Sequence, residues 1–325
     1  MTLSSTRFPP APGARILSLG GYQPGNVVTN DDISVRVDTS DEWIRSRVGV
    51  VSRRFAGPEE SVTDMAAVAG GKALAASGLS PGDVDLVIVA TCSTEAAIPN
   101  ASAVVAHRLG IVAPGAYDLN AACAGFCYAL ATASDAVRVG TARHVLVIGA
   151  EKMTAWVDQT DRSTCIIFAD GAGAAIVGPV ADGEPSGIGP VTWGSAGDMA
   201  EKIIIADRDS FLQQEGQAVF RWATTAMHPI AAQACERAGV AVSDLAAFVP
   251  HQANLRIIES IARKLGVPRE RLADDIVTAG NTSSASVPLA LSRMVERGAL
   301  KPGSLALLLG FGAGMCYAAQ VITVP

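Results

Sequence analysis

Residues 73–91 read ALAASGLSPGDVDLVIVAT, and residues 234–252 read ACERAGVAVSDLAAFVPHQ. Both stretches pass from a helical pattern through a glycine and an aspartate into an apolar strand. Gly78 corresponds to Gly239, 161 positions later, and the aspartate follows at the same spacing in each copy. The shared order of these features indicates that one α/β unit occurs twice in the chain.

The same offset joins Asn120 to Asn281 and Cys123 to Ser284. Because several landmarks share one offset in the same order, we expect an α/β protein built from two related halves. A helical pattern rich in small residues follows in each half, at 124–138 after Cys123 and at 285–297 after Ser284. The apolar strand candidates are 85–91, 144–150, 165–170, 174–178, 246–250 and 304–310.

We place the boundary between the halves in the stretch 178–190, GPVADGEPSGIGP, which is rich in glycine and proline. The two predicted units are therefore residues 1–178 and 179–325. The chain has 325 residues, of which 49% are hydrophobic, and only 5% are aromatic. This composition suits a large aliphatic core with buried parallel strands.

The charge and cysteine content exclude several classes of protein. A net charge of −6 and a pI near 5.3 argue against a general nucleic-acid binder. The six cysteines have neither zinc-site spacing nor the density of a small disulfide scaffold, so we expect no metal site. The N-terminal residues lack a signal-peptide pattern, and no apolar run is long enough to span a membrane. We therefore expect a soluble, reduced, cytoplasmic protein.

Cys123 stands in the stretch LNAACAGFCYAL, residues 119–130, where a helix is expected to begin. The unpaired N–H groups and the dipole at a helix N-terminus lower the pKa of a thiol, so this position favours a reactive thiolate. The alanines and glycine around it leave space for a substrate. Taken alone, however, a cysteine between alanines is also an ordinary core residue.

His251 directly follows an apolar strand, beside the polar residues Gln252 and Asn254. A residue at a strand end is suited to binding or catalysis, although a lone histidine can be a structural hydrogen-bonding group. Asn281 precedes a helix in AGNTSSASVPLAL, where an N-cap or Asx turn is the alternative. Glycines in LLLGFGAGMCYAA, residues 308–319 (Gly310, Gly312 and Gly314), allow a sharp turn that directs N–H groups inward.

Together, the motifs ACAGF, PHQANLRII, GNTSSAS and GFGAG resemble those of the thiolase-fold condensing enzymes, and most closely the β-ketoacyl-acyl-carrier-protein synthase III family. The resemblance also includes DTSDEWIRSRVG, DRSTCIIFADGAGA and EGQAVFRWA, and it extends from about residue 14 to the C-terminus. It implies a thiolase-like fold, in which two duplicated α/β halves form a layered αβαβα core.

The resemblance implies a decarboxylative condensation that begins fatty acid synthesis. Cys123 would take a short acyl group from a coenzyme A thioester, the substrate, with no separate cofactor. His251 and Asn281 would bind the thioester carbonyl of malonyl-acyl carrier protein and hold the enolate left by loss of CO₂. The backbone N–H groups of Cys123 and Ala313 would form the oxyanion hole.

The resemblance also assigns the residues that would bind the substrates, and it implies a homodimer. Coenzyme A would contact Thr39, Trp43, Arg47 and Arg162, and the acidic carrier protein would contact Arg221, Arg256, Arg263 and Lys264. The acyl pocket would include Phe220, Phe311 and Ile98, with Ile98 reaching the pocket of the partner subunit. Straight-chain-selective members can carry phenylalanine at this position, so Ile98 favours branched primers.

Four alternatives to a fatty-acid enzyme follow from the same residues. A starter-unit ketosynthase or acyltransferase of a polyketide pathway shares the scaffold, and the same Cys–His–Asn set serves both. A thiolase would need a second active cysteine, and Cys316 lacks the matching context. A dehydrogenase is disfavoured because GAGAAIVG continues as a strand instead of opening a helix. A non-catalytic binding module would not need the complete Cys–His–Asn set.

Overall fold

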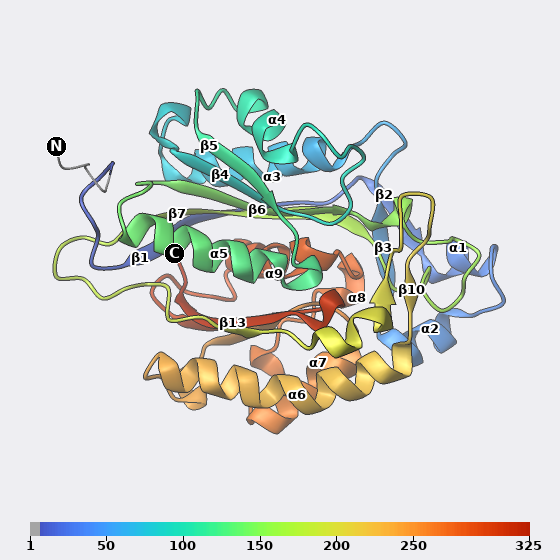
Figure 1. Cartoon of the computed structure of the whole chain (residues 1–325). Coiled ribbons are helices and arrows are strands. Elements are labelled where there is room, and N and C mark those ends of the chain that lie inside the picture. Colours follow the sequence, from blue (N-terminus) through green and yellow to red (C-terminus); the bar gives the residue numbers. More distant parts are fainter. Residues whose placement is uncertain (1–6) are drawn as a thin grey trace.

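Two β-sheets lie one above the other, with a pair of helices between them and further helices on both outer faces (Figure 1). The structure is a computed structural model, and it describes residues 7–325. The first sheet has five strands, in the spatial order β1 (Ala14–Tyr22), β7 (Asp170–Pro179), β6 (Val145–Lys152), β4 (Leu86–Ala90) and β5 (Gly115–Leu119). The second sheet has four strands, in the order β11 (Ala247–Pro250), β12 (Leu305–Phe311), β13 (Tyr317–Thr323) and β8 (Thr192–Gly194).

The helices form the other three layers. The outer face of the first sheet is covered by α3 (Val62–Ser77) and α4 (Ala101–Arg108), and that of the second by α6 (Gly216–Arg237) and α7 (Leu255–Leu265). The middle layer holds α5 (Gly125–Arg138) and α9 (Ser286–Glu296). Within residues 7–325, no helix combines the length and apolar character needed to cross a membrane. The short remaining helices are α1 (Asn30–Ser34), α2 (Asp41–Val48) and α8 (Ile276–Ala279). Two small antiparallel sheets pair β2 (Asn26–Thr29) with β3 (Ser52–Phe55), on either side of α1 and α2 in the chain, and β9 (Ile203–Ile204) with β10 (Gln213–Gln214) in a hairpin.

The two halves repeat the same strand pairing. In the first, β4 runs parallel to β6, which is antiparallel to β7; in the second, β11 runs parallel to β12, which is antiparallel to β13. The offset of 161 also holds for the backbone, because Ala122 and Ser283 both have positive φ angles, 45° and 49°. Short 3₁₀ turns begin at these two residues and lead into α5 and α9. The predicted duplicated, layered α/β architecture is therefore confirmed.

The middle helices pack against both sheets, so the two halves share one core. The cluster between the sheets takes its apolar residues from strands of both halves and from α5 and α9. Every residue of β4, LVIVA, is buried, as expected for a strand covered on both faces. This shared core matters for function because it places the starts of α5 and α9 side by side.

The strand predicted at residues 165–170 is wrong. This segment forms turns and a single backbone bridge, and β7 begins only at Asp170. The buried Arg53 side chain donates from Nη2 to the carbonyl of Ile166 at 2.8 Å. The carbonyl of Ile167 accepts the N–H of Asn281 at 2.9 Å. The backbone groups of this segment therefore form hydrogen bonds that position Asn281, and they do not pair within a sheet.

Gly149 of β6 allows the start of α9 to approach the first sheet. A Cβ at this position would lie 2.5 Å from the carbonyl oxygen of Ser284. Gly149→Ala should therefore lower the free energy of unfolding by about 1–3 kcal/mol, the usual cost of overpacking. Chemical denaturation measures this loss. Gly82→Ala is the matched control, since its nearest neighbour would be 3.9 Å away, and an unchanged stability in both variants would contradict the prediction.

Candidate active site

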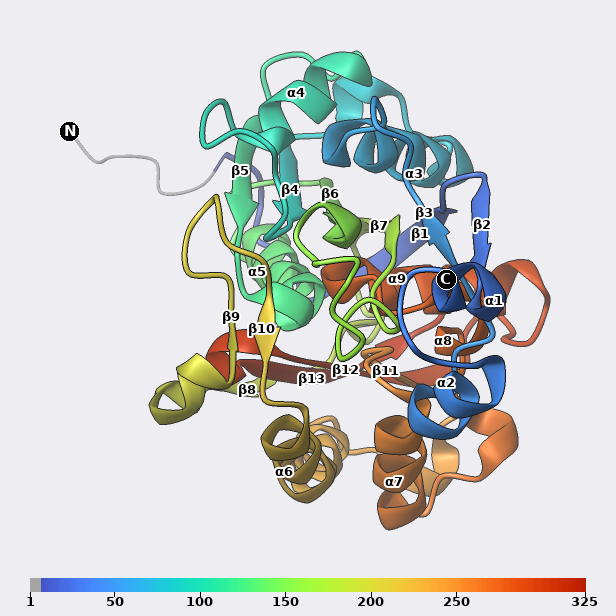
Figure 2. The ribbon, with the colours of Figure 1, turned by 90° about the vertical axis from the view of Figure 1, so that its right-hand side faces the viewer.

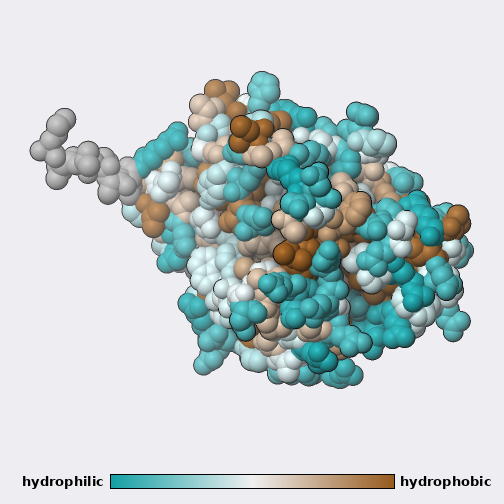
Figure 3. Space-filling view, turned by 45° about the vertical axis from the view of Figure 1, so that its right-hand side comes forward, coloured by the Kyte–Doolittle hydropathy of each residue, from teal (hydrophilic) through white to brown (hydrophobic). Residues whose placement is uncertain are grey.

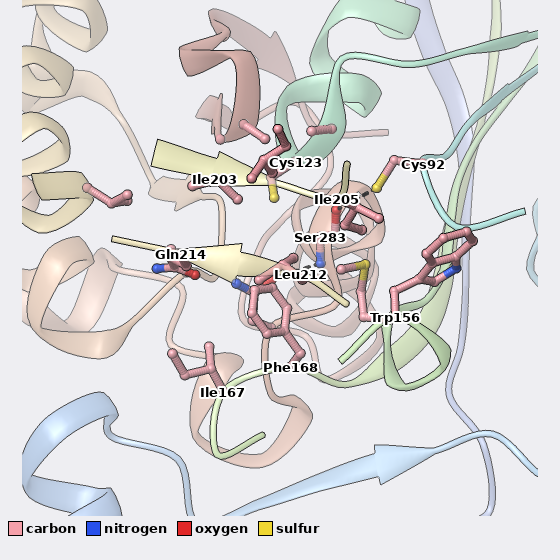
Figure 4. A pocket seen from close by; sticks show the side chains of 18 of the residues that line it. Cys92, Cys123, Trp156, Ile167, Phe168, Ile203, Ile205, Leu212, Gln214 and Ser283 are labelled. Carbon is pink, nitrogen blue, oxygen red and sulfur yellow. Dashed lines mark hydrogen bonds between the residues drawn. The ribbon is translucent and has the colours of Figure 1, made fainter. Parts of the chain in front are cut away.

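A cavity of about 780 Å³ opens where the starts of α5 and α9 meet the ends of β11 and β12. Cys123, His251 and Asn281, predicted from separate parts of the sequence, all line it. Figure 4 shows Cys123, Cys92 and Ser283 together, with apolar side chains around them. The apolar lining comes partly from the β9–β10 hairpin, which leads into α6 (Figure 2), and includes Met153, Trp156, Ile167, Phe168, Ile203, Ile204, Ile205 and Leu212.

Cys123 lies in the 3₁₀ turn that precedes α5, and Gly312 approaches it closely from the other half of the chain. A Cβ on Gly312 would lie 2.7 Å from Cβ of Cys123 and 2.9 Å from its sulfur, so only glycine fits there. Hydrogen bonds from the backbone N–H groups of Cys123 and Ala313 lower the pKa of the thiol. The two predicted oxyanion-hole donors therefore converge on the sulfur.

The protonation state of Cys123 differs from the one expected from its helix position. Burial raises the pKa of the thiol to about 12. A hydrogen bond with Ser283 and the two backbone N–H groups lower this pKa, while the negative charge of Glu151 raises it further. The expected thiolate is thus wrong, because desolvation outweighs the helix terminus.

His251 is buried at the end of β11, as its position after an apolar strand predicted. Its backbone N–H donates to the carbonyl of Leu309 at 2.6 Å, and its Nδ1 lies 2.7 Å from Oγ of Ser286. The ring packs edge-on against Phe311, with 5.3 Å between ring centroids. Burial lowers the pKa of the imidazole to about 3, so the ring is neutral at neutral pH.

Asn281 is held by both of its backbone groups and by its side chain. Its N–H donates to Ile167, its carbonyl accepts the N–H of Ala169, and its Oδ1 accepts the N–H of Ser283 at 2.9 Å. The last bond is the Asx turn that was considered as the alternative, and Asn120 makes the same bond to Ala122 at 3.1 Å. Because this turn occupies Oδ1, the amide NH₂ of Asn281 is left as the donor toward the cavity.

The His251 ring should not titrate between pH 5 and 8. A histidine in the unfolded chain has a pKa near 6.5, so as pH falls the unfolded chain takes up a proton that the buried ring refuses. This ring therefore stabilises the fold above pH 6.5, and that contribution is lost as pH falls from 6.5 toward 3. NMR of the imidazole signals, assigned with His251→Asn, measures this directly. A midpoint near pH 6.5 would contradict the burial argument.

Glu151 and Ser283 belong to the same site but were not predicted. Glu151 ends a buried stretch of β6 and is itself fully buried. Its carboxylate accepts hydrogen bonds from Ser283 Oγ at 3.0 Å and Ser93 Oγ at 2.5 Å, and from Cys92 N at 3.1 Å and Sγ at 3.4 Å. The available signal was a charged residue at the carboxyl end of an apolar strand, the same signal that identified His251.

The residues predicted to bind coenzyme A lie together outside the cavity lining. The guanidinium carbons of Arg47 and Arg162 stand 5.5 Å and 5.0 Å from the centre of the Trp43 ring, which is the cation–π packing considered as the alternative. Thr39 is partly buried, and its Oγ1 has no hydrogen-bond partner among the described residues. Asn254, which lines the cavity, donates to the carbonyl of Arg47 at 3.1 Å and so links α2 to the cavity.

The residues predicted to bind the carrier protein lie on α6 and α7. Arg221, Arg256 and Phe220 line a groove of about 360 Å³, and Phe220 also lines the main cavity. The guanidinium of Arg256 stands 5.4 Å from the Phe220 ring centre. All four basic residues are exposed, including Arg263 and Lys264, and Lys264 Nζ donates to the carbonyl of Thr224 at 2.5 Å.

Of the three residues predicted for the acyl pocket, Phe220 and Phe311 line the cavity and Ile98 does not. Ile98 is 86% exposed, whereas its neighbours Ala96 and Ala97 are part of the lining. Its insertion into a partner subunit therefore stays a prediction.

Two family models match the chain. Residues 117–197 match "3-Oxoacyl-[acyl-carrier-protein (ACP)] synthase III", and residues 235–324 match the C-terminal model of the same enzyme. The first match contains Cys123, and the second contains His251 and Asn281.

Full-length relatives agree with the family models. Beta-ketoacyl-[acyl-carrier-protein] synthase III 4 of Streptomyces coelicolor is 55% identical over 96% of this chain and 99% of its own. The crystal structure of the priming β-ketosynthase of the R1128 polyketide pathway superposes with a TM-score of 0.94 at 43% identity, covering 99% of both chains. That of 3-oxoacyl-[acyl-carrier-protein] synthase III from Aquifex aeolicus gives 0.92 at 39%, covering 96% and 100%. The chain has the thiolase-like fold and belongs to the β-ketoacyl-acyl-carrier-protein synthase III family of acyltransferases, which are condensing enzymes.

Proposed function

We propose that this enzyme joins a short acyl group from acyl-coenzyme A to malonyl-acyl carrier protein, releasing CO₂, and thereby starts fatty acid synthesis. The main observation in support is that Cys123, His251 and Asn281 all line one largely apolar cavity. The steps below use a thiol, a neutral imidazole, an amide and two backbone N–H groups. We therefore propose that the reaction uses coenzyme A only as part of its substrate and needs no cofactor or metal ion.

In the first half-reaction, the Cys123 sulfur attacks the acyl thioester carbon. The carbonyl oxygen becomes an oxyanion that the backbone N–H groups of Cys123 and Ala313 would hold, and the effect of both groups on the pKa of the Cys123 thiol supports this role. Collapse of the tetrahedral intermediate breaks the bond to the coenzyme A sulfur and leaves the acyl group on Cys123. The proton lost by Cys123 goes to the coenzyme A sulfur, which departs as a thiol.

In the second half-reaction, His251 and Asn281 bind the thioester carbonyl of malonyl-acyl carrier protein. Ser286 Oγ already accepts the N–H of Gln252 at 3.3 Å, so its hydroxyl hydrogen is available for Nδ1 of His251. This arrangement places the histidine proton on Nε2, from which it can be donated to the substrate. The C–C bond to the malonyl carboxylate breaks and releases CO₂, and the neutral imidazole and the Asn281 amide hold the enolate that is left. Its carbon attacks the acyl carbon, and the bond from that carbon to the Cys123 sulfur breaks, which frees Cys123.

We further propose that the enzyme is a homodimer joined along β5. This strand lies at the edge of the first sheet, and apolar residues near it are exposed, notably Ile98, Val112 and Tyr117. The space-filling view shows apolar surface at the top of the molecule, in the region of α4 (Figure 3). An exposed edge strand beside an apolar patch is a natural site for pairing with a second copy.

Ile98→Phe should shift primer choice away from branched acyl groups. In the proposed dimer, the larger ring would fill the space that a branched carbon needs, and one extra carbon group in an apolar pocket is worth about tenfold or more in kcat/KM. Steady-state kinetics with isobutyryl- and acetyl-coenzyme A measure the ratio. The control is Val35→Phe, because Val35 is also 86% exposed and lies outside the cavity lining. An unchanged ratio for Ile98→Phe would contradict the placement.

We assign Trp43, Arg47 and Arg162 to the adenine end and phosphates of coenzyme A, and Thr39 to their vicinity. The clustering of two guanidinium groups at one aromatic ring next to the cavity supports this assignment. We assign the groove at Arg221 and Arg256, together with Arg263 and Lys264, to the acidic carrier protein. Four exposed basic residues on a chain of net charge −6 support it.

A second candidate function is the priming step of a polyketide pathway. The match to the R1128 priming β-ketosynthase favours it, because the similarity covers 99% of both chains. The condensation assay tests both functions: purified enzyme, an acyl-coenzyme A, and malonyl groups on a fatty-acid or a polyketide carrier protein. A 3-ketoacyl product on the fatty-acid carrier supports the first function, and a product only on the polyketide carrier supports the second. No product on either would contradict both.

A further inference from the structure

The site contains a buried carboxylate that the mechanism above does not use. Glu151 is fully buried beneath the nucleophile, on β6, and every hydrogen bond recorded for it in residues 7–325 is donated to it by a neutral group. The donors are the hydroxyls of Thr91, Ser93 and Ser283 and the backbone amide and thiol of Cys92. An ionised carboxylate accepts hydrogen bonds only, so this arrangement fits a buried anion.

Ser283 connects this carboxylate to the nucleophile. Its Oγ donates to Glu151 Oε1 at 3.0 Å and lies 3.9 Å from Sγ of Cys92, and its hydrogen bond lowers the pKa of the Cys123 thiol. Its φ of 49° lies in the left-handed region, and the Asx turn to Asn281 holds it there. Ser283 lies between the thiols of Cys123 and Cys92 in the view of Figure 4, and it lines the cavity.

We propose that Ser283 and Glu151 form a proton relay that takes up the proton of Cys123 when the acyl group is transferred. The thiol proton passes to Ser283 Oγ while the serine hydroxyl proton passes to Glu151 Oε1. The Cys123 sulfur forms its bond to the acyl carbon, the bond from that carbon to the coenzyme A sulfur breaks, and the relay runs backwards to protonate the departing sulfur. Ser283 is a catalytic residue, and Glu151 acts through it.

Charge conservation favours this route over release of the proton to water. A thiolate beside ionised Glu151 would place two negative charges in one buried site, which is costly. Transfer of the proton to Glu151 leaves a single negative charge throughout. The titratable side chains near Glu151 are the thiols of Cys92 and Cys123, and its hydrogen-bond donors in residues 7–325 are neutral, so none of them brings a positive charge to offset a second anion.

His251 is a poor alternative acceptor. Burial lowers the pKa of its ring to about 3, so an imidazolium is disfavoured in this site. In the proposed mechanism its Nδ1 is paired with Ser286 and its Nε2 already carries a proton. Within residues 7–325, Ser283 is therefore the remaining side chain that is hydrogen-bonded both to the Cys123 thiol and to a carboxylate.

The relay is tested by rapid-quench measurement of acyl-enzyme formation from acetyl-coenzyme A, from pH 6 to 9. Glu151→Gln and Ser283→Ala should each slow acylation by about 10²–10³-fold at pH 7. The wild-type rate should change little with pH, whereas the Glu151→Gln rate should rise about tenfold per pH unit because the thiolate must then form without a base. The double variant should be no slower than the slower single variant, since both act on one path.

A matched control and a second activity separate the relay from a structural role. Ser284→Ala removes the neighbouring buried hydroxyl, which bonds the carbonyl of Ala90 at 2.8 Å, and should leave acylation unchanged. Decarboxylation of malonyl-acyl carrier protein does not use the relay, and it should change less than about threefold in Glu151→Gln and Ser283→Ala. Equal losses in acylation and decarboxylation would overturn the proposal, as would a wild-type rate and pH profile in both variants.

The inference rests on the proposed acyl-cysteine mechanism, so alkylation of Cys123 by iodoacetamide is measured in parallel. This reaction needs removal of the same proton but no acyl-coenzyme A. Absence of acyl transfer in the wild type would defeat the proposed function, while the pH dependence of alkylation would still test the relay. If Glu151→Gln does not fold, the acylation rate of Ser283→Ala tests the relay by itself. This variant deletes one oxygen and keeps the backbone N–H that orients Asn281.

Discussion

Cys123→Ala is expected to lower the rate of condensation by about 10⁴-fold or more, because in the proposed mechanism the acyl group is carried on the Cys123 sulfur. The same variant should still decarboxylate malonyl-acyl carrier protein, since we assign that step to His251 and Asn281. The two activities are measured separately, by the formation of 3-ketoacyl-carrier protein and by the release of CO₂. The change removes only a sulfur atom at a position next to alanines, so the fold should persist.

Cys127→Ala is the matched control for this variant. Burial also raises the pKa of Cys127 to about 12, and this thiol lies on α5 one turn after Cys123, but it does not line the cavity as Cys123 does. Cys127→Ala should keep most of the condensation activity. Comparable losses in the two variants would show that the effect comes from packing at the start of α5 and would contradict the role of Cys123.

His251→Ala and Asn281→Ala should each slow decarboxylation by about 10²–10³-fold, the usual effect of deleting one donor to a developing negative charge. Acylation of Cys123 should be much less affected, because its oxyanion is held by backbone groups of Cys123 and Ala313. Release of CO₂ and the rate of acyl-enzyme formation, measured on the same preparations, separate the two steps.

The control for these variants is His228→Ala, on α6 and outside the cavity lining. Its decarboxylation should stay within about twofold of the wild type. We assign acylation to the backbone groups and decarboxylation to these two side chains. If His251→Ala and Asn281→Ala slowed acylation as much as decarboxylation, this assignment would be wrong.

Much of the fold can be predicted from the sequence because the patterns that indicate it are local and occur in both halves. The glycine before the aspartate recurs at Gly78 and Gly239, both with left-handed φ angles, and each ends a helix before a buried strand. The rival dehydrogenase interpretation also fails locally, since GAGAAIVG is part of β7. Cys316, the second cysteine considered for a thiolase, lies outside the residues that line the cavity.

What the sequence could not predict depends on contacts between distant segments. The segment 165–170 has the composition of a strand, yet Arg53 and Asn281 take its backbone groups. The position of Cys123 at a helix start is visible in the sequence, but its desolvation is not, and burial reverses the expected direction of its pKa. The same holds for Glu151, whose hydroxyl partner Ser283 is 132 positions away.

The most direct test of the central claim is the intact mass of the enzyme after mixing with equimolar acetyl-, butyryl-, isobutyryl- and 2-methylbutyryl-coenzyme A, followed by peptide mapping. We predict one acyl adduct on the peptide that contains Cys123, absent from Cys123→Ala, with the dominant mass identifying the preferred primer. An adduct on another residue, or none from any of the four donors, would contradict the assignment of Cys123 as the acyl-carrying nucleophile for short primers.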